Sequence, residues 1–586
     1  MFKEFQEIIL GLKRTASLLE KEEKRTLLFA TLIMFVTGFL TNFPAIVLGK
    51  FVDRITSLDN PTFSVAIPSL IFIVGIILLR EFLTVIRKYF VENVATRTEK
   101  KQTVGTVNRL LKTDIDFITK ARIGALHGRI FRSIQGLVRL IKLGFLDFFP
   151  AFFAALTALV IAFYQKPSLA SFMILVVPFG LFIVVKQIAS QKGIRVSLLR
   201  GKEDVDGKVV EMMGGLETIR VLNTSDVEIQ GIEHIAERLR KIEIRHHIAM
   251  ALYDATKYLN EAFFYVLVVS TAVYFAVHGI ITTGDILMYS ILFMSVISPL
   301  REIHRILDEA HESSIRVQDL YELQHEPLDV SFDVESTPRN DTDNAVEIRG
   351  LSFNYKDSGK RVLNNLNLAI RNGEKIGLVG ASGHGKTTLV KIFLRLIHNY
   401  EGGVFLFGKN LQNVAREEIA VKVAYIPQKS YVFRGTIREN IIYGCSRKVS
   451  TEEIQKAAQN ANILQEIRTS LGGLDGFVAE NGNNLSGGQK QRLALARLML
   501  GSPELLILDE ATSALDNTNE AIVQKNIEEA FRDATVITIA HRLTTLRSAD
   551  RILVFREGSI VQEGTYQELS QKEGAFKEFL KQQPRE

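Results

Sequence analysis

Tryptophan is absent from this chain of 586 residues, and cysteine occurs once, at Cys445. A single cysteine excludes an internal disulfide and leaves too few thiolates for a cysteine-based metal site. Without Trp, only Tyr could supply a polar-tipped aromatic belt at a membrane surface. A cleavable signal peptide is not expected either, since the first apolar run begins near Leu27 and is too long for one.

Long apolar runs are missing after about residue 300 but frequent before it. Six of them, each about 20 residues long, are apolar enough to span a membrane as helices. Their approximate limits are 27–49, 64–86, 143–164, 168–190, 258–279 and 284–303. The formal net charge of +6 would suit a nucleic-acid binder, yet the basic residues cluster between the apolar runs. That distribution is typical of a membrane protein's cytoplasmic loops, so we expect no nucleic-acid partner.

The gaps after the second and fourth runs are long and rich in Lys and Arg, whereas the other gaps are short and contain few. The positive-inside rule places the long gaps and both termini in the cytoplasm. Because the long gaps keep a helical pattern, they are predicted to extend the flanking helices below the bilayer. Each should reverse at a short surface helix, near residues 114–124 and 214–223. The alternative is that they are merely amphipathic cytoplasmic helices.

Residues 326–344 are rich in Pro, Asp, Ser and Thr, which is the composition of a linker. They separate a predicted all-α transmembrane domain, residues 1–325, from a predicted soluble α/β domain, residues 345–586. Six short apolar runs typical of strands lie in the second domain. These runs are Val346–Ile348, Lys375–Val379, Val423–Ile426, Leu505–Leu508, Thr535–Ile539 and Arg551–Phe555.

The segment Gly380-Ala-Ser-Gly-His-Gly-Lys-Thr-Thr388 fits the P-loop pattern, between a predicted strand and a predicted helix over 389–397. Glycines let the backbone turn its N–H groups toward phosphates, and the helix N-terminus adds a favourable dipole. Lys386 is predicted to hold the β- and γ-phosphates and Thr387 to bind Mg²⁺. His384 occupies a variable position and is assigned no role.

Two carboxylates end the apolar run Leu505–Leu508. Asp509 is expected to lie beside the P-loop and hold Mg²⁺ through water, while Glu510 orients the water that attacks the γ-phosphate. Phosphoryl transfer needs mainly positioning and charge stabilisation, so one carboxylate for the metal and one for water suffice. The predicted reaction is ATP hydrolysis.

Further motifs make the chain resemble an ABC transporter half-molecule of the exporter type over essentially its whole length. Gln428 matches the Q-loop, and the exporter segment that follows it is 433–441. The signature is Leu485-Ser-Gly-Gly-Gln489, the D-loop is Ser513-Ala-Leu-Asp516, and His541 matches the switch histidine. Tyr355 matches the aromatic residue that stacks on adenine. One segment, Ala479-Glu-Asn-Gly482, departs from the family's Gly-Glu-Arg-Gly.

The resemblance implies a multi-domain membrane protein: a six-helix membrane domain, then an α/β P-loop cassette with a helical subdomain. It implies ATP and Mg²⁺ as cofactors. The implied catalytic residues are Glu510, His541, Gln428 and Lys386, and the implied metal ligands are Thr387, Gln428 and Asp509. The implied nucleotide contacts are Tyr355, Gly380, Ser382, Gly383, Gly385, Lys386, Thr387, Thr388, Gln428 and His541. A second copy would contribute Ser486, Gly487, Gly488, Gln489 and Asp516 to the same ATP.

The chain has half of the family's working unit, so a homodimer is expected, with a heterodimer of similar half-transporters as the alternative. The resemblance implies an exporter or flippase of a bacterial plasma (inner) membrane. Spans rich in Phe, Leu, Ile and Val suit a hydrophobic or amphipathic cargo: lipid, drug-like compound or peptide. An importer on the same architecture and an ATP-gated channel or sensor subunit are the alternative functions.

Ionisable or polar residues inside the spans are candidates for a cargo path. The candidates are Arg80, Glu81, Asp147, Asn260 and Glu261. Several lie near span ends, where snorkelling or an interhelical ion pair is the alternative interpretation.

Overall fold

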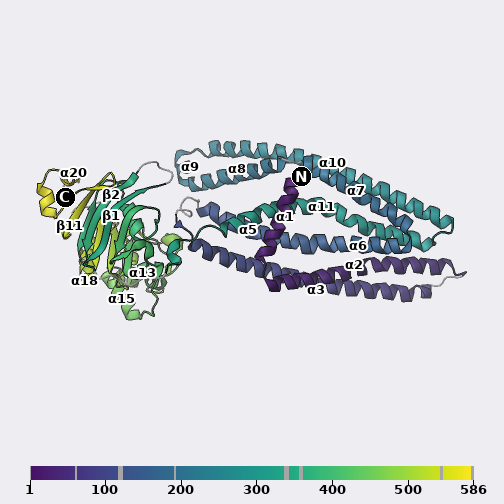
Figure 1. The fold of residues 1–586 in the computed structure, drawn as a ribbon, viewed down its shortest axis with the longest axis horizontal. Coiled ribbons are helices and arrows are strands. Elements are labelled where there is room, and N and C mark those ends of the chain that lie inside the picture. The colour runs from purple at the N-terminus through teal and green to yellow at the C-terminus, as the bar shows by residue number, and fades with distance from the viewer. Residues whose placement is uncertain are drawn as a thin grey trace. The chain divides into compact units, whose positions relative to one another are not determined.

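The computed structural model describes residues 2–59, 63–115, 123–190, 193–334, 342–355, 361–540 and 546–582. The chain divides into a helical unit, residues 1–111 and 122–326, and a second unit, residues 112–121 and 327–586. Figure 1 shows the helical unit as long helices and the second unit as sheets with short helices around them. This is the predicted fold class, a helical membrane domain followed by an α/β domain.

The helical unit consists of long helices joined by short connections (Figure 1). Its elements are α1 (Phe2–Leu18), α2 (Lys21–Thr56), α3 (Ile67–Leu111), α5 (Ile123–Lys142), the π-helical segment η2 (Leu143–Phe148), α6 (Phe149–Gln165), α7 (Pro167–Ser190), α8 (Ile194–Gly214), α9 (Leu216–Leu222), α10 (Ser225–Val277) and α11 (Thr283–Leu323). The short helix α9 lies where the second reversal was predicted. The first predicted reversal falls mostly on 116–122, outside the described residues.

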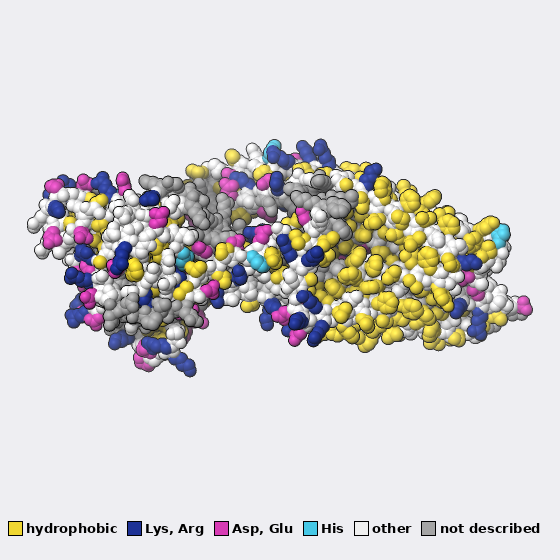
Figure 2. All heavy atoms as spheres, in the orientation of Figure 1, with side chains coloured by type: hydrophobic (Ala, Val, Ile, Leu, Met, Phe, Trp, Pro, Cys, Tyr) yellow, Lys and Arg dark blue, Asp and Glu magenta, His cyan; other side chains and the backbone are white. Residues whose placement is uncertain are grey.

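Six helical stretches in the described part of the chain are long and apolar enough to cross a membrane. They are Lys21–Thr56, Phe63–Leu111, Leu126–Gln165, Pro167–Ser190, Ser225–Val277 and Thr283–Leu323. The 53 residues of α10 correspond to about 80 Å at ~1.5 Å per residue, whereas the apolar core of a bilayer is about 30 Å thick. Such a helix continues well beyond the bilayer. On the visible face of this unit, hydrophobic side chains form a band with Lys and Arg at its edges (Figure 2).

The spanning helices α2, α6, α7, α10 and α11 share one hydrophobic core. Tyr289 and Phe293 of α11 are almost fully buried in it. Small residues allow the closest approach, as is usual between membrane helices. A Cβ atom added to Gly284 of α11 would lie within van der Waals overlap of the Gly49 carbonyl on α2. Asn42 of α2 ties α2 to α6 by donating to the carbonyl of Ala154 at 2.7 Å.

The second unit is built on a six-stranded sheet with the order β12-β11-β3-β10-β9-β6. Its strands are β3 (Lys375–Val379), β6 (Val423–Ile426), β9 (Leu505–Asp509), β10 (Thr535–Ile539), β11 (Arg551–Arg556) and β12 (Ser559–Gly564). All neighbours pair in parallel except β11 and β12. The central strands are buried on both faces, so they are apolar runs without alternation.

A four-stranded antiparallel sheet with the order β2-β1-β4-β5 belongs to the same unit. It contains β1 (Asn344–Asn354), β2 (Arg361–Arg371), β4 (Glu401–Leu406) and β5 (Lys409–Asn410), and a small sheet pairs β7 (Gly435–Thr436) with β8 (Phe477–Val478). The helices are α12 (Lys386–Phe393), α13 (Arg416–Lys422), α14 (Ile437–Ile442), α15 (Thr451–Asn460), α16 (Leu464–Thr469), α17 (Gly487–Leu498), α18 (Asn517–Ala530), α19 (Tyr566–Gln571) and α20 (Ala575–Gln582). Helices α14 to α17 form a helical subdomain, and they share a second hydrophobic core with α18 and one face of β6, β9 and β10.

The helix after the P-loop differs from its prediction. It was expected over 389–397, but α12 ends at Phe393. The reason is that Arg395 takes a left-handed φ of +51°, which stops the helix. The buried Arg395 guanidinium holds this turn by donating to the carbonyls of Gln412, at 2.7 Å, and Val414.

Candidate functional site

The P-loop, Gln428, Asp509 and Glu510 meet at one edge of the six-stranded sheet. The P-loop follows β3, Gln428 follows β6, and Asp509 ends β9. Because these strands are parallel, their carboxyl ends face the same crevice, where ligands bind in open α/β sheets. A cavity of about 610 Å³ lies there. It is lined by Tyr355, Val362, Ser382, Gly383, Gly385, Lys386, Thr387, Thr388, Gln428, Asp509, Glu510 and Ile539.

Lys386 is the first residue of α12 and is only 7% exposed. Its ammonium donates to the P-loop carbonyls of Gly380, at 2.6 Å, and Ala381, at 3.0 Å. Burial lowers the pKa of Lys386, and the carboxylates of Asp509 and Glu510 act in the opposite direction. The cation is therefore held at the cavity wall by acceptors that a phosphate could replace.

Gly385 is the residue on which the P-loop turn depends. It has a φ of +98°, and an added Cβ would lie 2.7 Å from the Val362 carbonyl oxygen. An L side chain here is strained by conformation and excluded by contact. The glycine allows the chain to enter α12 with its first N–H groups directed at the cavity.

Tyr355 lies just after β1 and is half-buried at the cavity wall. Its hydroxyl is 3.3 Å from that of Thr388, and its ring meets Phe353 edge-on at 4.9 Å. The structure thus places an aromatic side chain in the same cavity as the P-loop.

Asp509 is the last residue of β9 and is 6% exposed. The hydroxyl of Tyr425, on β6, donates to its carboxylate at 3.4 Å. Burial raises the pKa of Tyr425 to about 12, and the neighbouring Asp509 carboxylate adds to the shift. Tyr425 therefore stays a neutral hydrogen-bond donor that orients Asp509.

Glu510 adopts a left-handed φ of +51° at the turn that follows β9. Its N–H donates to the carbonyl of Ile539, at the end of β10, at 3.0 Å. The side-chain amide of Gln428 donates to its carboxylate at 2.6 Å. Strained backbone of this kind is found mostly at active sites, where the surrounding structure holds it.

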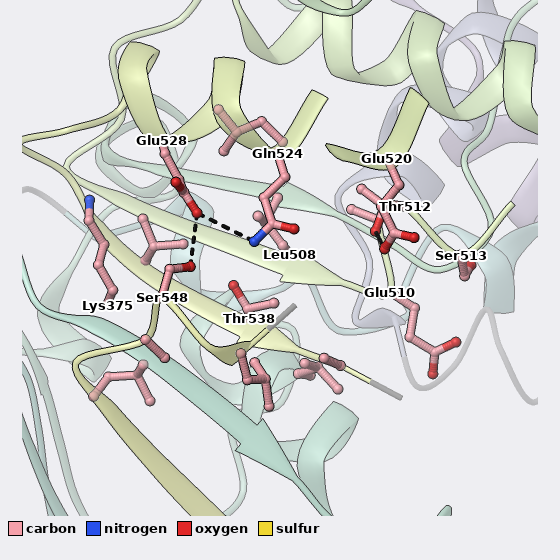
Figure 3. Close-up of a pocket in the computed structure, with 18 residues that line it drawn as sticks. Lys375, Leu508, Glu510, Thr512, Ser513, Glu520, Gln524, Glu528, Thr538 and Ser548 are labelled. Atoms are coloured by element: carbon pink, nitrogen blue, oxygen red, sulfur yellow. Dashed lines mark hydrogen bonds between the residues drawn. The ribbon is translucent and has the colours of Figure 1, made fainter. Parts of the chain in front are cut away.

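Glu510 also borders a second cavity, of about 270 Å³, between β9, β10 and α18 (Figure 3). Its walls are largely apolar. Glu528 at one end accepts hydrogen bonds from Gln524, at 3.3 Å, and Ser548, at 2.9 Å, while Thr512 donates to Glu520 at 2.9 Å. Because no P-loop residue lines it, this cavity is not the phosphate site.

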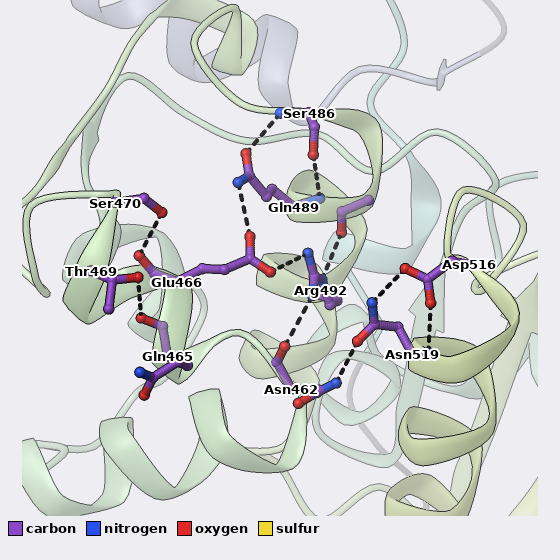
Figure 4. A network of polar contacts seen from close by, with 11 residues as sticks. Asn462, Gln465, Glu466, Thr469, Ser470, Ser486, Gln489, Arg492, Asp516 and Asn519 are labelled. Carbon is purple, nitrogen blue, oxygen red and sulfur yellow. Dashed lines mark hydrogen bonds and ion pairs between the residues drawn. The ribbon is translucent and has the colours of Figure 1, made fainter.

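Ser486 is the N-cap of α17, and it is exposed. It forms a capping box with Gln489: the Ser486 hydroxyl accepts from the Gln489 N–H at 3.2 Å, and the Gln489 side chain accepts from the Ser486 N–H at 2.9 Å (Figure 4). Gln489 also donates to Glu466 at 2.9 Å. The signature is therefore a capped helix N-terminus, and its residues do not line the cavity that contains Lys386.

Asp516 caps α18, and its carboxylate accepts from the backbone and side chain of Asn519 at 2.8 and 2.7 Å (Figure 4). These hydrogen bonds lower the pKa of Asp516. Asn519 in turn accepts from Asn462 at 2.6 Å, and Arg492 of α17 donates to the Asn462 carbonyl at 3.1 Å. The D-loop and the signature helix are thus joined by one polar network.

Gln491 was not singled out by the sequence analysis, yet it connects three of the motifs. It is 4% exposed, and its amide nitrogen lies 3.5 Å from the carbonyls of Gln428 and Glu510. Its amide oxygen accepts from the N–H of Ala514, in the D-loop, at 3.0 Å. The only available signal was its position on the signature helix, two residues after Gln489.

The donor set of the cavity fits ATP with Mg²⁺. The P-loop N–H groups and Lys386 supply positive charge for phosphates. The hydroxyl of Thr387, the amide oxygen of Gln428 and the carboxylate of Asp509 are hard oxygen ligands. Mg²⁺ is usually held by one or two carboxylates together with phosphates and water. His541 falls on 541–545, outside the described residues.

The polar residues predicted inside the spans are mostly paired. Arg80 contacts its neighbour Glu81 at 2.5 Å, Asp147 contacts Arg305 at 3.5 Å, and Glu261 contacts Arg301 at 2.8 Å. Asn260 of α10 lies beside Gly180 of α7: a Cβ atom added to this glycine would be 3.8 Å from the Asn260 amide nitrogen. The last two ion pairs join α11 to η2 and α10, which favours the structural interpretation of these charges.

Two family models match the chain. Residues 27–300 match the ABC transporter transmembrane region, and residues 363–513 match the ABC transporter domain. An uncharacterized ABC transporter ATP-binding protein of Bacillus subtilis, YwjA, is 27% identical over 94% of this chain and 96% of its own length. An ATP-dependent lipid A-core flippase of Desulfotalea psychrophila is 26% identical over the same shares.

The structure of a bacterial Atm1-family ABC exporter with ATP bound has the same fold. Its TM-score is 0.84 at 23% sequence identity, and the match covers 97% of this chain and 100% of that chain. The matches extend over both units, so the membrane helices and the nucleotide site belong to one architecture.

Proposed function

The chain belongs to the ABC transporter family as an exporter-type half-transporter that hydrolyses ATP, and from this premise we propose that two identical copies form one transporter. The second unit, here called the cassette, would close with its counterpart around two ATP molecules. Closure and hydrolysis would switch the helical domains between inward-facing and outward-facing states. A hydrophobic or amphipathic molecule would be exported or flipped across the membrane.

In the proposed site, Tyr355 stacks on adenine. The P-loop residues Gly380, Ser382, Gly383, Gly385, Thr387 and Thr388 surround the phosphates, and Lys386 holds the β- and γ-phosphates. Glu510 orients and polarises the attacking water, and Gln428 steadies Glu510 through the 2.6 Å hydrogen bond. We assign to His541 a contact with the γ-phosphate, on the family resemblance alone.

Mg²⁺ belongs to the proposal because the oxygen donors of Thr387, Gln428 and Asp509 line one cavity. When bound, the ion neutralises charge that develops on the phosphate oxygens. The chain's own contribution is to hold these donors in place. Tyr425 orients the Asp509 carboxylate, and Gln428 keeps its amide oxygen available because its nitrogen is the atom that contacts Glu510.

The observation that carries the dimer proposal is the separation of the two phosphate-facing motifs. Ser486 and Gly487, at the start of α17, are exposed, and no signature residue lines the cavity of its own P-loop. An exposed helix N-terminus attracts an anion. We infer that Ser486, Gly487, Gly488 and Gln489 meet the γ-phosphate held by the other copy, with Asp516 beside that interface.

Mixing two defective chains tests this arrangement. Lys386→Ala and Ser486→Ala each damage both sites of a homodimer. In a mixed dimer, sites built across the interface would put both defects in one site and leave the other intact. Differently tagged chains, co-purified as mixed dimers, should therefore recover ATP hydrolysis above either parent. Sites confined to one copy predict no recovery, which would contradict the proposal.

We propose that the transporter lies in a bacterial plasma (inner) membrane with its cassette and termini in the cytoplasm. The basic long gaps of the sequence support this orientation. Lipid is the first cargo class to test, because a similar protein is a lipid A-core flippase. ATP hydrolysis in lipid nanodiscs would be measured with lipids, drug-like compounds and peptides added in turn. The Glu510→Gln variant would serve as the control for background hydrolysis. Stimulation by none of them would contradict the proposed cargo.

A further inference from the structure

A third cavity, of about 560 Å³, lies in the helical unit beneath the amphipathic helix α1. We call it the α1 cavity. Its walls come from α1, the beginning of α2, the junction of α5, η2 and α6, and α11. Almost all of its lining residues are apolar, and they include Ile8, Leu12, Leu27, Phe145, Phe148 and Phe149. Its volume is within the range of ligand-binding cavities, about 300–1,000 Å³.

The π-helical turn of η2 shapes one wall of the α1 cavity. The N–H of Phe149 donates to the carbonyl of Gly144, five residues earlier, in place of the usual α-helical partner. Phe145, Phe148 and Phe149 all line the cavity from this region. Short π-helical turns inside α-helices are frequent at functional sites.

Two threonines lie in this apolar wall, Thr15 and Thr31, and the Thr31 hydroxyl already donates to the carbonyl of Leu27. Thr15 is 6% exposed and lines the cavity, and its hydroxyl has no hydrogen-bond partner among the described residues. A buried hydroxyl without a partner costs free energy that a ligand acceptor would recover. The oxygen is covered in this conformation, so the carbonyl group of an apolar ligand would satisfy it after the side chain turns toward the cavity.

Lys24 is the one ionisable side chain among the described residues that line the α1 cavity. It is exposed, and it forms no ion pair with another described residue. Lys24 stands where α2 changes from the charged segment 20–25 to the apolar run that begins at Leu27. Such a change marks the membrane–water interface, where basic side chains meet lipid headgroups. In Figure 2, Lys and Arg side chains lie at this edge of the hydrophobic band.

We propose that the α1 cavity binds an anionic glycerophospholipid. One acyl chain would lie between the phenyl rings of η2 and α6 and the apolar face of α1. The Thr15 hydroxyl would donate to an ester carbonyl, and the Lys24 ammonium would contact the phosphate. The acyl chain of such a lipid matches the apolar wall, its ester carbonyl matches the buried hydroxyl, and its phosphate matches the cation at the rim. The bound lipid would fasten α1 to the bundle, apart from any cargo.

Native mass spectrometry of the full-length protein would measure the tightest lipid-binding event. The probes are phosphatidylglycerol and phosphatidylcholine with identical acyl chains. The wild type should prefer phosphatidylglycerol about fivefold, the factor expected for one Lys at an anionic surface. Lys24→Ala should remove this preference. Lys21→Ala, an equal charge change on the same helix outside the cavity, should keep it.

Filling the cavity tests the acyl-chain part of the proposal. Thr15→Trp should abolish the tightest binding event. Leu78→Trp adds the same ring at a position on α3 that is 65% exposed, and should not. If Thr15→Trp fails to fold, Thr15→Val provides the test. It replaces the hydroxyl by a methyl group of similar size, and it should weaken the binding of both lipids severalfold. Equal affinity of the wild type for both lipids, or tight binding by Thr15→Trp, would overturn the proposal.

Discussion

The side-chain amide of Gln428 donates a hydrogen bond of 2.6 Å to the carboxylate of Glu510. Gln428 follows β6 and Glu510 follows β9, and these strands are neighbours in the sheet. The hydrogen bond holds the carboxylate in one orientation, from which it can act on a water molecule as a general base. It also links the segment after β6 to the hydrolytic site. A movement of Gln428 would therefore change the position of the Glu510 carboxylate.

Replacing Glu510 by Gln keeps the side-chain shape but removes the basic oxygen. We expect ATP hydrolysis to fall by a factor of about 10² or more, the range for loss of a general base. ATP binding should persist, because the P-loop and Lys386 are untouched, and the closed dimer should accumulate. Phosphate release and retention of labelled ATP would measure the two effects. Hydrolysis at the wild-type rate would remove Glu510 from the assigned role.

Gln428→Glu would place a second carboxylate beside Glu510. Like charges at this distance raise a carboxyl pKa, so deprotonation of the pair would require a higher pH. The acid limb of the pH–rate profile should move upward by on the order of 1 pH unit. Gln428→Leu removes the donor without adding charge, and should lower kcat without that shift. An unmoved acid limb in Gln428→Glu would contradict the pairing during turnover.

Gly385→Ala should weaken ATP binding more than Gly383→Ala. Both glycines have a left-handed φ, which costs an L residue about 1–2 kcal/mol. Only at Gly385 does the new Cβ also meet a carbonyl, that of Val362 at 2.7 Å, whereas nothing lies within 4 Å of it at Gly383. Dissociation constants for ATP, measured in the Glu510→Gln background, would compare them. Equal losses would mean that the contact has no effect.

Asp329 is a buried carboxylate that joins the segment after α11 to the cassette core. It contacts Arg416 at 2.8 Å and His398 at 3.1 Å. Burial alone would raise the pKa of Asp329, but hydrogen bonds from His398 and Ser331 hold it below its usual range. Its contribution to stability is therefore present above the unfolded-state pKa, about 4, and is lost as pH falls through the lower folded-state pKa.

Asp329→Asn should lower the melting temperature of the full-length protein at pH 7 by several degrees, since breaking a buried ion pair costs about 3 kcal/mol. The difference from wild type should stay constant to about pH 5 and narrow only in stronger acid. Asp475→Asn is the control: its ion pair with Arg438 is exposed and contributes at most about 1 kcal/mol. A difference that grows with acidification would show the opposite linkage.

The predicted strands show how much secondary structure the local sequence pattern could predict. Lys375–Val379, Val423–Ile426 and Thr535–Ile539 coincide with β3, β6 and β10. β3 and β10 are buried on both faces and β6 is mostly covered, so the apolar composition of these strands is itself the signal. β2 and β12 were not predicted because their outer faces are exposed and polar. The end of α12 was misplaced because it depends on Arg395, whose guanidinium bonds to carbonyls about 20 residues away.

The sequence by itself determined the six apolar spans, the P-loop, the carboxylates of Asp509 and Glu510 at the end of β9, and the signature, because each is encoded in adjacent residues. Only the tertiary structure decided which residues meet. It brings Gln428 to Glu510, places Gln491 beneath both, and leaves Ser486 outside the cavity of its own P-loop. It also forms the α1 cavity from four segments that no local pattern connects. Strand order and helix packing set these distances, and both depend on contacts between residues remote in the chain.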